Sequence, residues 1–304
     1  MVNSAPASNP SPALADFGWQ GFDGARLAAS AAGPLGAPTG VLFAHGFGQT
    51  RQAWASSMRQ LGEAGVGSAA WDMRGHGQSA WNAPGKAYEV EQFIADALAV
   101  RATLDAAPVL VGASMGGLVG LAAQARGATF AALVLVDVTP RWEAAGMQRI
   151  LAFMGAHPDG FDDAEHAARA IAAYLPHRRE KKSAADLSHL LVQGHDGRLR
   201  WHWDPRLLAD LADSAKHQDD LSEAARGIDV PVLLISGGKS DLVSDETIAH
   251  FRSLVPHVEH VRLPDATHMV VGDDNDTFTR IVVDFIGART TAGAVHGPLR
   301  GARP

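Results

Sequence analysis

The chain has 304 residues, of which 46% are hydrophobic and 19% are charged, so it is long enough to bury a sizeable core. A formal net charge of −7, without a Lys- or Arg-rich stripe, excludes an extended nucleic-acid-binding surface. The lack of cysteine excludes disulfides, iron–sulfur clusters and thiolate nucleophiles, and no apolar run approaches the ~20 residues that span a membrane. Any chemistry must therefore come from Ser, His, Asp or Glu.

Both ends of the chain differ in composition from the middle. Residues 1–17 are rich in Ala, Ser and Pro and lack the basic and apolar regions of a signal peptide, which predicts a flexible leader and a cytoplasmic location. Residues 289–304 carry small residues, Pro and Gly without periodicity, as a disordered tail does. The short basic stretch HRREKK at 177–182 is interpreted as a solvated helix end or loop. Nothing in these patterns indicates an oligomeric state.

Short apolar runs alternate with longer helical patterns from residue 40 onwards. Helices are predicted over 52–64, 90–104 and 115–125. The apolar runs, each followed by a Gly-rich or polar turn, are GVLFAHG, GVGSAAWDMRG, APVLVGAS, FAALVLVDVTP and VPVLLISGG. Runs this continuous are typical of strands buried on both faces of a mainly parallel sheet. The alternation predicts an α/β fold with helices on both sides of the sheet.

The alternation is interrupted between residues 140 and 226. This segment has the pattern of helices and loops with no convincing strand, and strand-like sequence resumes only at VPVLLISGG. It predicts a helical cap at 140–226, inserted into an α/β core formed by residues 18–139 and 227–288.

The segment LVGASMGGLVG places Ser114 between Gly112 and Gly116, after an apolar run and before a predicted helix. Such a sharp strand-to-helix turn projects the serine hydroxyl from the edge of the sheet, and glycines avoid clashes in so crowded a bend. The pattern G-x-S-x-G therefore indicates a nucleophile. The structural alternative is that Ser114 caps the helix.

A serine nucleophile needs a base, and the base needs an acid to orient it. His268, in LPDATHMVVGDD, follows the last strand-like run, EHVRL, and Asp241 follows VPVLLISGG. The carboxyl ends of parallel strands meet at one edge of the sheet, so Ser114, Asp241 and His268 are predicted to form a catalytic triad. Asp241 is alternatively a helix cap, and Asp137, which ends LVLVDVTP, is the alternative acid because it also follows a strand.

Five motifs together resemble the α/β-hydrolase fold superfamily, in its serine-nucleophile branch with a helical cap. They are AHGFGQ, WDMRGHGQS, GASMGG, SGGKSDLVS and DATHMV, which span the core from about residue 18 to 288. The order Ser, Asp, His matches the order in that superfamily. The resemblance also implies that the backbone N–H of Met115 and that of Phe47, which follows His-Gly, form the oxyanion hole. His76 falls in a structural turn of the superfamily and is not predicted to be catalytic.

The resemblance implies a hydrolase of carboxylic esters that acts through an acyl-enzyme on small to medium apolar substrates. Three alternatives remain open at this point: a carbon–carbon bond hydrolase of the meta-cleavage type, a cofactor-free perhydrolase, and a hydrolase-like receptor that binds a ligand. A serine at the elbow disfavours dehalogenases and epoxide hydrolases, which carry a carboxylate there.

Neither a metal nor an organic cofactor is predicted, because the histidines lack H-E-x-x-H spacing and no phosphate-binding glycine motif occurs. The expected partner is a small-molecule ester or related acyl compound, with neither nucleic acid nor membrane. Trp142 and Trp203 in the cap are possible substrate-pocket residues, although packing within the cap explains them equally well.

Overall fold

A computed structural model describes residues 13–294 except 35, 177–182, 184 and 274. Its centre is an eight-stranded sheet in the order β1-β2-β4-β3-β5-β6-β9-β10, in which β1 and β2 are antiparallel to their neighbours and the other strands are parallel. The predicted α/β fold is confirmed. The strands are β1 Ala15–Gln20, β2 Arg26–Ala32, β3 Thr39–Ala44, β4 Gly67–Trp71, β5 Val109–Ala113, β6 Ala132–Val136, β9 Val232–Gly237 and β10 Glu259–Leu263.

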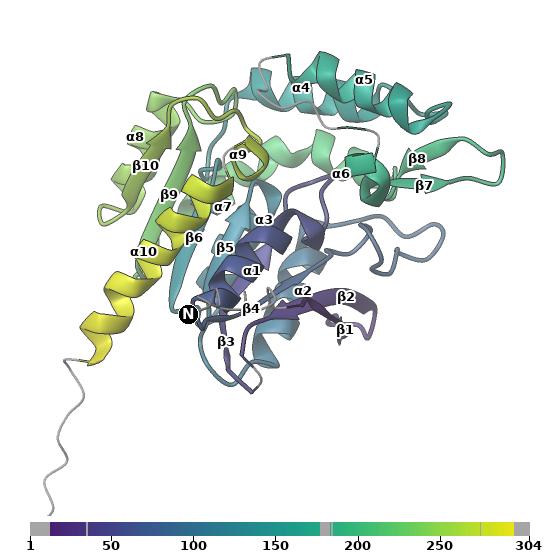
Figure 1. Cartoon of the computed structure of the whole chain (residues 1–304). Helices are drawn as coiled ribbons and strands as arrows, with labels where there is room; N and C mark the ends of the chain where they lie inside the picture. The colour runs from purple at the N-terminus through teal and green to yellow at the C-terminus, as the bar shows by residue number, and fades with distance from the viewer. Residues whose placement is uncertain (1–12, 35, 177–182, 184, 274, 295–304) are drawn as a thin grey trace, which may run out of the picture.

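Successive residues of the central strands face opposite sides of the sheet, and both sides are buried. In β5, Leu110 belongs to the apolar cluster on one face and Val111 to the cluster on the other. This two-sided burial explains why the central strands are continuous apolar runs. The first face packs against α2, α3, α7 and α8, and the second against α1 and α10 (Figure 1). These helices are α1 Ala55–Glu63, α2 Val90–Ala102, α3 Met115–Ala125, α7 Gln218–Arg226, α8 Asp245–Leu254 and α10 Asn275–Ala294.

The predicted helices agree closely with the observed ones. The helix predicted over 115–125 is α3, and 90–104 corresponds to α2. The segment 52–64 divides into a 3₁₀ turn, Arg51–Trp54, followed by α1. Thr50 caps this turn, since its hydroxyl accepts a hydrogen bond from the backbone N–H of Gln52.

The insertion between β6 and β9 forms a layer across one end of the sheet (Figure 1). The prediction that it contains no strand is wrong, because β7 and β8 form an antiparallel hairpin. Each strand has only three residues, too few to show an alternating pattern, and the turn depends on Gly197 at a φ of 80°. The elements are α4 Ala144–Gly155, α5 Ala164–Tyr174, a 3₁₀ helix Ala185–Leu190, β7 Leu191–Gln193, β8 Leu199–Trp201, α6 Leu207–Ala212 and the 3₁₀ helix η3 Ser214–His217.

The described residues shift three of the predicted boundaries. β1 begins at Ala15, inside the predicted leader, and α10 continues to Ala294, inside the predicted tail. The last helix of the predicted cap, α7, packs on the core through Leu221 and Ala225. Residues 1–12, 177–182 and 295–304 lie outside the described residues. Among the helices that the structure describes, none is both long and apolar enough to cross a membrane.

Arg74, in the loop after β4, joins three separate segments from a buried position. Its guanidinium donates two hydrogen bonds to Asp96 on α2, at 2.8 and 2.9 Å, and others to Asp23 and Asn82. Asp96 is only 2% exposed, and burial raises the pKa of its carboxyl. The carboxylate therefore depends on Arg74 to remain charged inside the protein.

Replacing Arg74 by Met should lower the free energy of unfolding by about 3–5 kcal/mol, because Asp96 is left buried without its partner. Arg126→Met is the matched control. It breaks an exposed pair with Glu91 and should cost about 1 kcal/mol or less. Urea denaturation measures both values, and equal losses for the two variants would contradict a structural role for the buried pair.

Candidate active site

Ser114 stands at the junction of β5 and α3 in a strained backbone conformation. Its φ is 47° and its ψ is −119°, a region that non-glycine residues rarely adopt. The hydroxyl makes no capping hydrogen bond to α3, so the helix-cap alternative does not describe this serine. The turn instead presents the hydroxyl to a cavity.

The glycines beside Ser114 allow the turn to pack against neighbouring backbone. A Cβ on Gly112 would lie 2.5 Å from the Cα of Gly117, and one on Gly116 would lie 2.3 Å from the carbonyl oxygen of Ala44. Both separations are far below van der Waals contact. The G-x-S-x-G pattern is therefore required by packing of the elbow against α3 and the end of β3.

His268 is hydrogen bonded to Asp137, and not to Asp241. Its Nδ1 lies 2.7 Å from Oδ2 of Asp137, which is 1% exposed at the end of β6. The same carboxylate accepts hydrogen bonds from the backbone N–H of Gly237, at 2.7 Å, and from the hydroxyl of Ser240, at 2.5 Å. Three donors thus hold Asp137 in place, and Asp137 in turn fixes the orientation of the imidazole.

The expectation that Asp241 holds His268 is corrected by this geometry. The Asp241 carboxylate pairs with Arg149 on α4, at 2.8 Å. Gly146, on the same helix, approaches so closely that a Cβ there would lie 2.1 Å from the carbonyl oxygen of Asp241. The cap thus fixes the loop after β9 and draws the side chain of Asp241 toward Arg149. Nor does Asp241 cap α8, whose N-cap is Ser244.

The two N–H groups predicted for the oxyanion hole are free of protein hydrogen bonds. Within the described residues, neither the N–H of Phe47 nor that of Met115 donates a hydrogen bond. The Phe47 loop lies beside the elbow, since a Cβ on Gly46 would be 3.3 Å from the Cβ of Ser114. Two unpaired donors next to a serine hydroxyl form an arrangement that can bind a developing oxyanion.

His45 holds the Phe47 loop, a role that the sequence analysis missed. Its Nδ1–H donates to the carbonyl oxygen of Gly46 at 2.8 Å, and its Nε2 accepts from the N–H of Met73 at 2.8 Å. These bonds require the neutral ring, and burial lowers the pKa of His45. The His-Gly dipeptide was the sequence feature that could have indicated this role, because a loop that is held in one orientation needs a buried hydrogen-bonding partner.

Two further buried histidines lie behind Phe47. The ring of His76 packs edge-on against Phe47, with centroids 5.4 Å apart, and burial places its pKa well below the usual value. His202 accepts a hydrogen bond from the N–H of Gly77 at 2.8 Å, and burial lowers its pKa to about 4. Both rings support the loop from outside the cavities that Ser114 lines.

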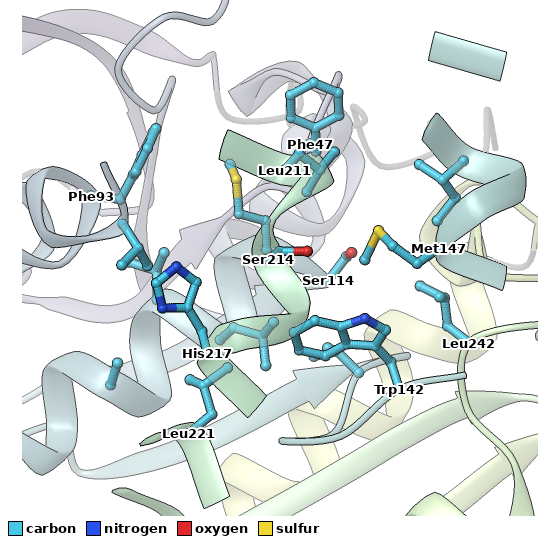
Figure 2. Close-up of a pocket in the computed structure, with 17 residues that line it drawn as sticks. Phe47, Phe93, Ser114, Trp142, Met147, Leu211, Ser214, His217, Leu221 and Leu242 are labelled. Carbon is cyan, nitrogen blue, oxygen red and sulfur yellow. The ribbon is translucent and has the colours of Figure 1, made fainter. Parts of the chain in front are cut away.

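Ser114 lies between two cavities beneath the insertion, with volumes of about 100 and 140 Å³. Phe47, Ser114 and Ile150 line both of them. His268 lines only the larger one. The smaller cavity, shown in Figure 2, has a mainly apolar wall that includes Phe93, Trp142, Met147, Leu211, Leu221 and Leu242.

Trp142 lines the smaller cavity, whereas Trp203 lines neither of the two. Trp203 is 3% exposed, and its ring packs against Phe47 with centroids 4.9 Å apart. Trp203 therefore supports the Phe47 loop from outside the two cavities. Among the described residues, no group of three or more His, Asp or Glu side chains is arranged to hold a metal ion.

A strained serine after a central parallel strand, with a buried carboxylate–histidine pair beside it, defines the class of α/β proteins that have a nucleophile elbow. Residues 41–281 match the sequence model of the alpha/beta hydrolase family, and the chain belongs to that family. The resemblance noted from the motifs is confirmed.

Individual relatives cover most of the chain. A 3-hydroxybutyrate-oligomer hydrolase of Cupriavidus necator is 32% identical over 212 residues, which cover 65% of this chain and 71% of that protein. Esterase Rv0045c of Mycobacterium tuberculosis is 28% identical over 263 residues, or 82% of this chain and 83% of the esterase. The esterase's crystal structure superposes with a TM-score of 0.72 over 92% of each chain. The crystal structure of E-2-(acetamidomethylene)succinate hydrolase has a TM-score of 0.78 at 24% identity, covering 90% of this chain and 100% of that one, which shows a common fold.

Because the pKa values of the buried histidines are lowered, we predict that the free energy of unfolding falls as the pH drops below about 6.5, the pKa of an unperturbed histidine. Their lowered pKa values mean that the unfolded chain binds more protons than the folded one between pH 6.5 and the folded pKa. Their contribution is complete above pH 6.5 and is lost as the pH falls. For His202 the loss is about 2 kcal/mol at about pH 5. Urea denaturation at about pH 7 and about pH 5 measures it, and His202→Asn should show a smaller pH dependence. An unchanged dependence would contradict the prediction.

Proposed function

We propose that the protein is a serine hydrolase of carboxylic esters that works through an acyl-enzyme. The observation that carries the proposal is the Asp137–His268 hydrogen bond, at 2.7 Å, in a cavity that Ser114 also lines. An imidazole whose Nδ1–H is held by a buried carboxylate has its Nε2 available to accept a proton. The match to the alpha/beta hydrolase family and the similarity to an esterase support the same reaction.

In the proposed mechanism, His268 Nε2 takes the proton from Ser114 Oγ as the oxygen attacks the ester carbonyl carbon. The negative charge on the carbonyl oxygen is stabilised by the N–H groups of Phe47 and Met115. His268 then gives its proton to the alcohol oxygen, and the C–O bond breaks. Water repeats the sequence on the acyl-enzyme, with His268 again as base and then as acid. Asp137 remains ionised throughout and stabilises the imidazolium. Apart from the substrate and water, these steps use protein groups alone.

We assign the two halves of the substrate to the two cavities. His268 must protonate the departing alcohol oxygen, and of the two cavities beside Ser114 it lines the larger and not the smaller, so we place the alcohol part in the larger cavity. The acyl part then occupies the smaller cavity, on the opposite side of Ser114. An apolar cavity of ~150 Å³ holds benzene, so the smaller cavity is expected to hold about four to six heavy atoms of the acyl chain beyond the carbonyl group. This favours small to medium esters.

The lining of both cavities favours uncharged substrates. Of the residues that the structure describes, none that lines either cavity is Lys or Arg. A carboxylate buried there would lack a cationic partner, which is costly. Because the relative from Cupriavidus necator is named for hydrolysis of 3-hydroxybutyrate oligomers, hydroxyacyl esters belong among the substrates tested.

The nucleophile is tested with a fluorophosphonate label and with p-nitrophenyl esters of increasing chain length. Ser114→Ala should abolish labelling and lower kcat/KM on the order of 10⁴-fold or more, with unchanged folding. Ser253→Ala, which removes an exposed serine on α8, is the control and should leave both unchanged. Full activity in Ser114→Ala would contradict the proposal. A wild-type chain that is labelled but does not turn over any ester would favour the receptor alternative.

The acid is tested by two matched variants. Asp137→Asn keeps the shape of the side chain but removes the charge and favours the wrong imidazole tautomer, so kcat should fall on the order of 10⁴-fold. Asp241→Asn breaks only a partly exposed ion pair with Arg149 and should change kcat by less than about threefold. Steady-state kinetics with circular dichroism as a folding control measures both. The reverse ranking would return the role to Asp241.

A further inference from the structure

The apolar wall of the smaller cavity is interrupted by two polar side chains that each carry a buried atom without a hydrogen-bond partner among the described residues. The hydroxyl oxygen of Ser214 and the Nε2 of His217 are buried, and neither makes a hydrogen bond within the part of the chain that the structure describes. Buried polar atoms are normally hydrogen bonded, because leaving them unpaired costs free energy. Two such atoms in one ligand-sized cavity are therefore a sign that a ligand supplies the missing partner.

Both side chains come from one short helix and line the same cavity. Ser214 and His217 are the first and last residues of η3, a 3₁₀ helix, in which side chains three positions apart lie on one face. In Figure 2 the Ser214 hydroxyl points toward the Ser114 hydroxyl, whereas the His217 ring lies nearer to Phe93, and both residues line this cavity. This cavity is the one that receives the acyl part of the substrate in the proposed function.

The hydrogen-bonding chemistry of Ser214 and His217 favours a hydroxyl group on the ligand. The serine hydroxyl can donate a hydrogen bond, and Nε2 of a neutral imidazole whose proton is on Nδ1 can accept one. An alcohol group both accepts and donates, so a hydroxyl on the substrate can pair with Ser214 or with His217. A plain alkyl chain would leave both atoms unpaired, and a carboxylate would find no Lys or Arg among the described residues of the wall.

We propose that Ser214 and His217 form a subsite that binds a hydroxyl group on the acyl chain, so that the enzyme prefers hydroxyacyl esters to the corresponding plain acyl esters. The inference rests on the proposed function, because it takes Ser114 as the nucleophile and the smaller cavity as the acyl site. Ser214 and His217 are specificity-determining residues, with no part in the transfer of the proton.

The test compares p-nitrophenyl esters of hexanoate, 3-hydroxyhexanoate and 6-hydroxyhexanoate. The wild-type protein should prefer one of the hydroxyhexanoates to hexanoate in kcat/KM. Ser214→Ala and His217→Leu should each lower that ratio on the order of tenfold, the effect of about one lost hydrogen bond. Ser214→Thr, which keeps a hydroxyl, should retain the preference. Met147→Leu, an apolar exchange in the same cavity, should leave the ratio unchanged.

A binding measurement separates this inference from the proposed function. In the Ser114→Ala background, calorimetry should show tighter binding of the preferred methyl hydroxyhexanoate than of methyl hexanoate, and Ser214→Ala should remove the difference. If simple esters are hydrolysed through Ser114 but the ratio is the same in wild type, Ser214→Ala and His217→Leu, the subsite is overturned and the proposed function stands. If no ester is hydrolysed but the binding preference is found, the proposed function fails and the hydroxyl site stands.

Discussion

The buried carboxylate of Asp137 is the interaction on which the arrangement of the site depends. It follows β6 and accepts hydrogen bonds from Gly237 at the end of β9, from Ser240 in the next loop, and from His268 beyond β10. One side chain therefore joins the end of β6 to two segments that lie far apart in the sequence, the end of β9 with its loop and the loop after β10. A buried carboxylate is stable only when such donors surround it, and the order β6-β9-β10 in the sheet brings them together.

A second group of contacts prepares the other side of Ser114. The elbow packs on the ends of β3 and α3 because Gly112 and Gly116 have no side chains, and the Phe47 loop is held by the neutral ring of His45. The strain at Ser114, with a φ of 47°, is maintained by this surrounding packing. The groups proposed to react are thus positioned by the folded core before any substrate binds, which is the condition for electrostatic stabilisation of a transition state.

The core and the insertion contribute different things. Every group in the proposed mechanism comes from loops at the carboxyl ends of core strands, whereas much of the wall of both cavities comes from the insertion. Ile150 on α4 lines both cavities, and η3 adds the polar atoms of Ser214 and His217 to the smaller one. Changes in the insertion can therefore alter which acyl and alcohol groups fit while the proposed chemistry is retained.

The sequence alone determined the α/β fold, the elbow at Ser114 and the family, because buried parallel strands and glycine-dependent turns depend on local patterns. It favoured Asp241 over Asp137 as the partner of His268, although both follow strands, and β6 and β9 are neighbours in the sheet. Only the tertiary structure decided between them: α4 packs on the loop after β9, pairs Asp241 with Arg149 and leaves Asp137 next to the imidazole. For the same reason, the sequence did not show that Trp203 supports the Phe47 loop or that Ser214 and His217 line the smaller cavity. Whether a side chain lines a cavity or supports a loop depends on packing between segments distant in sequence, which no local pattern records.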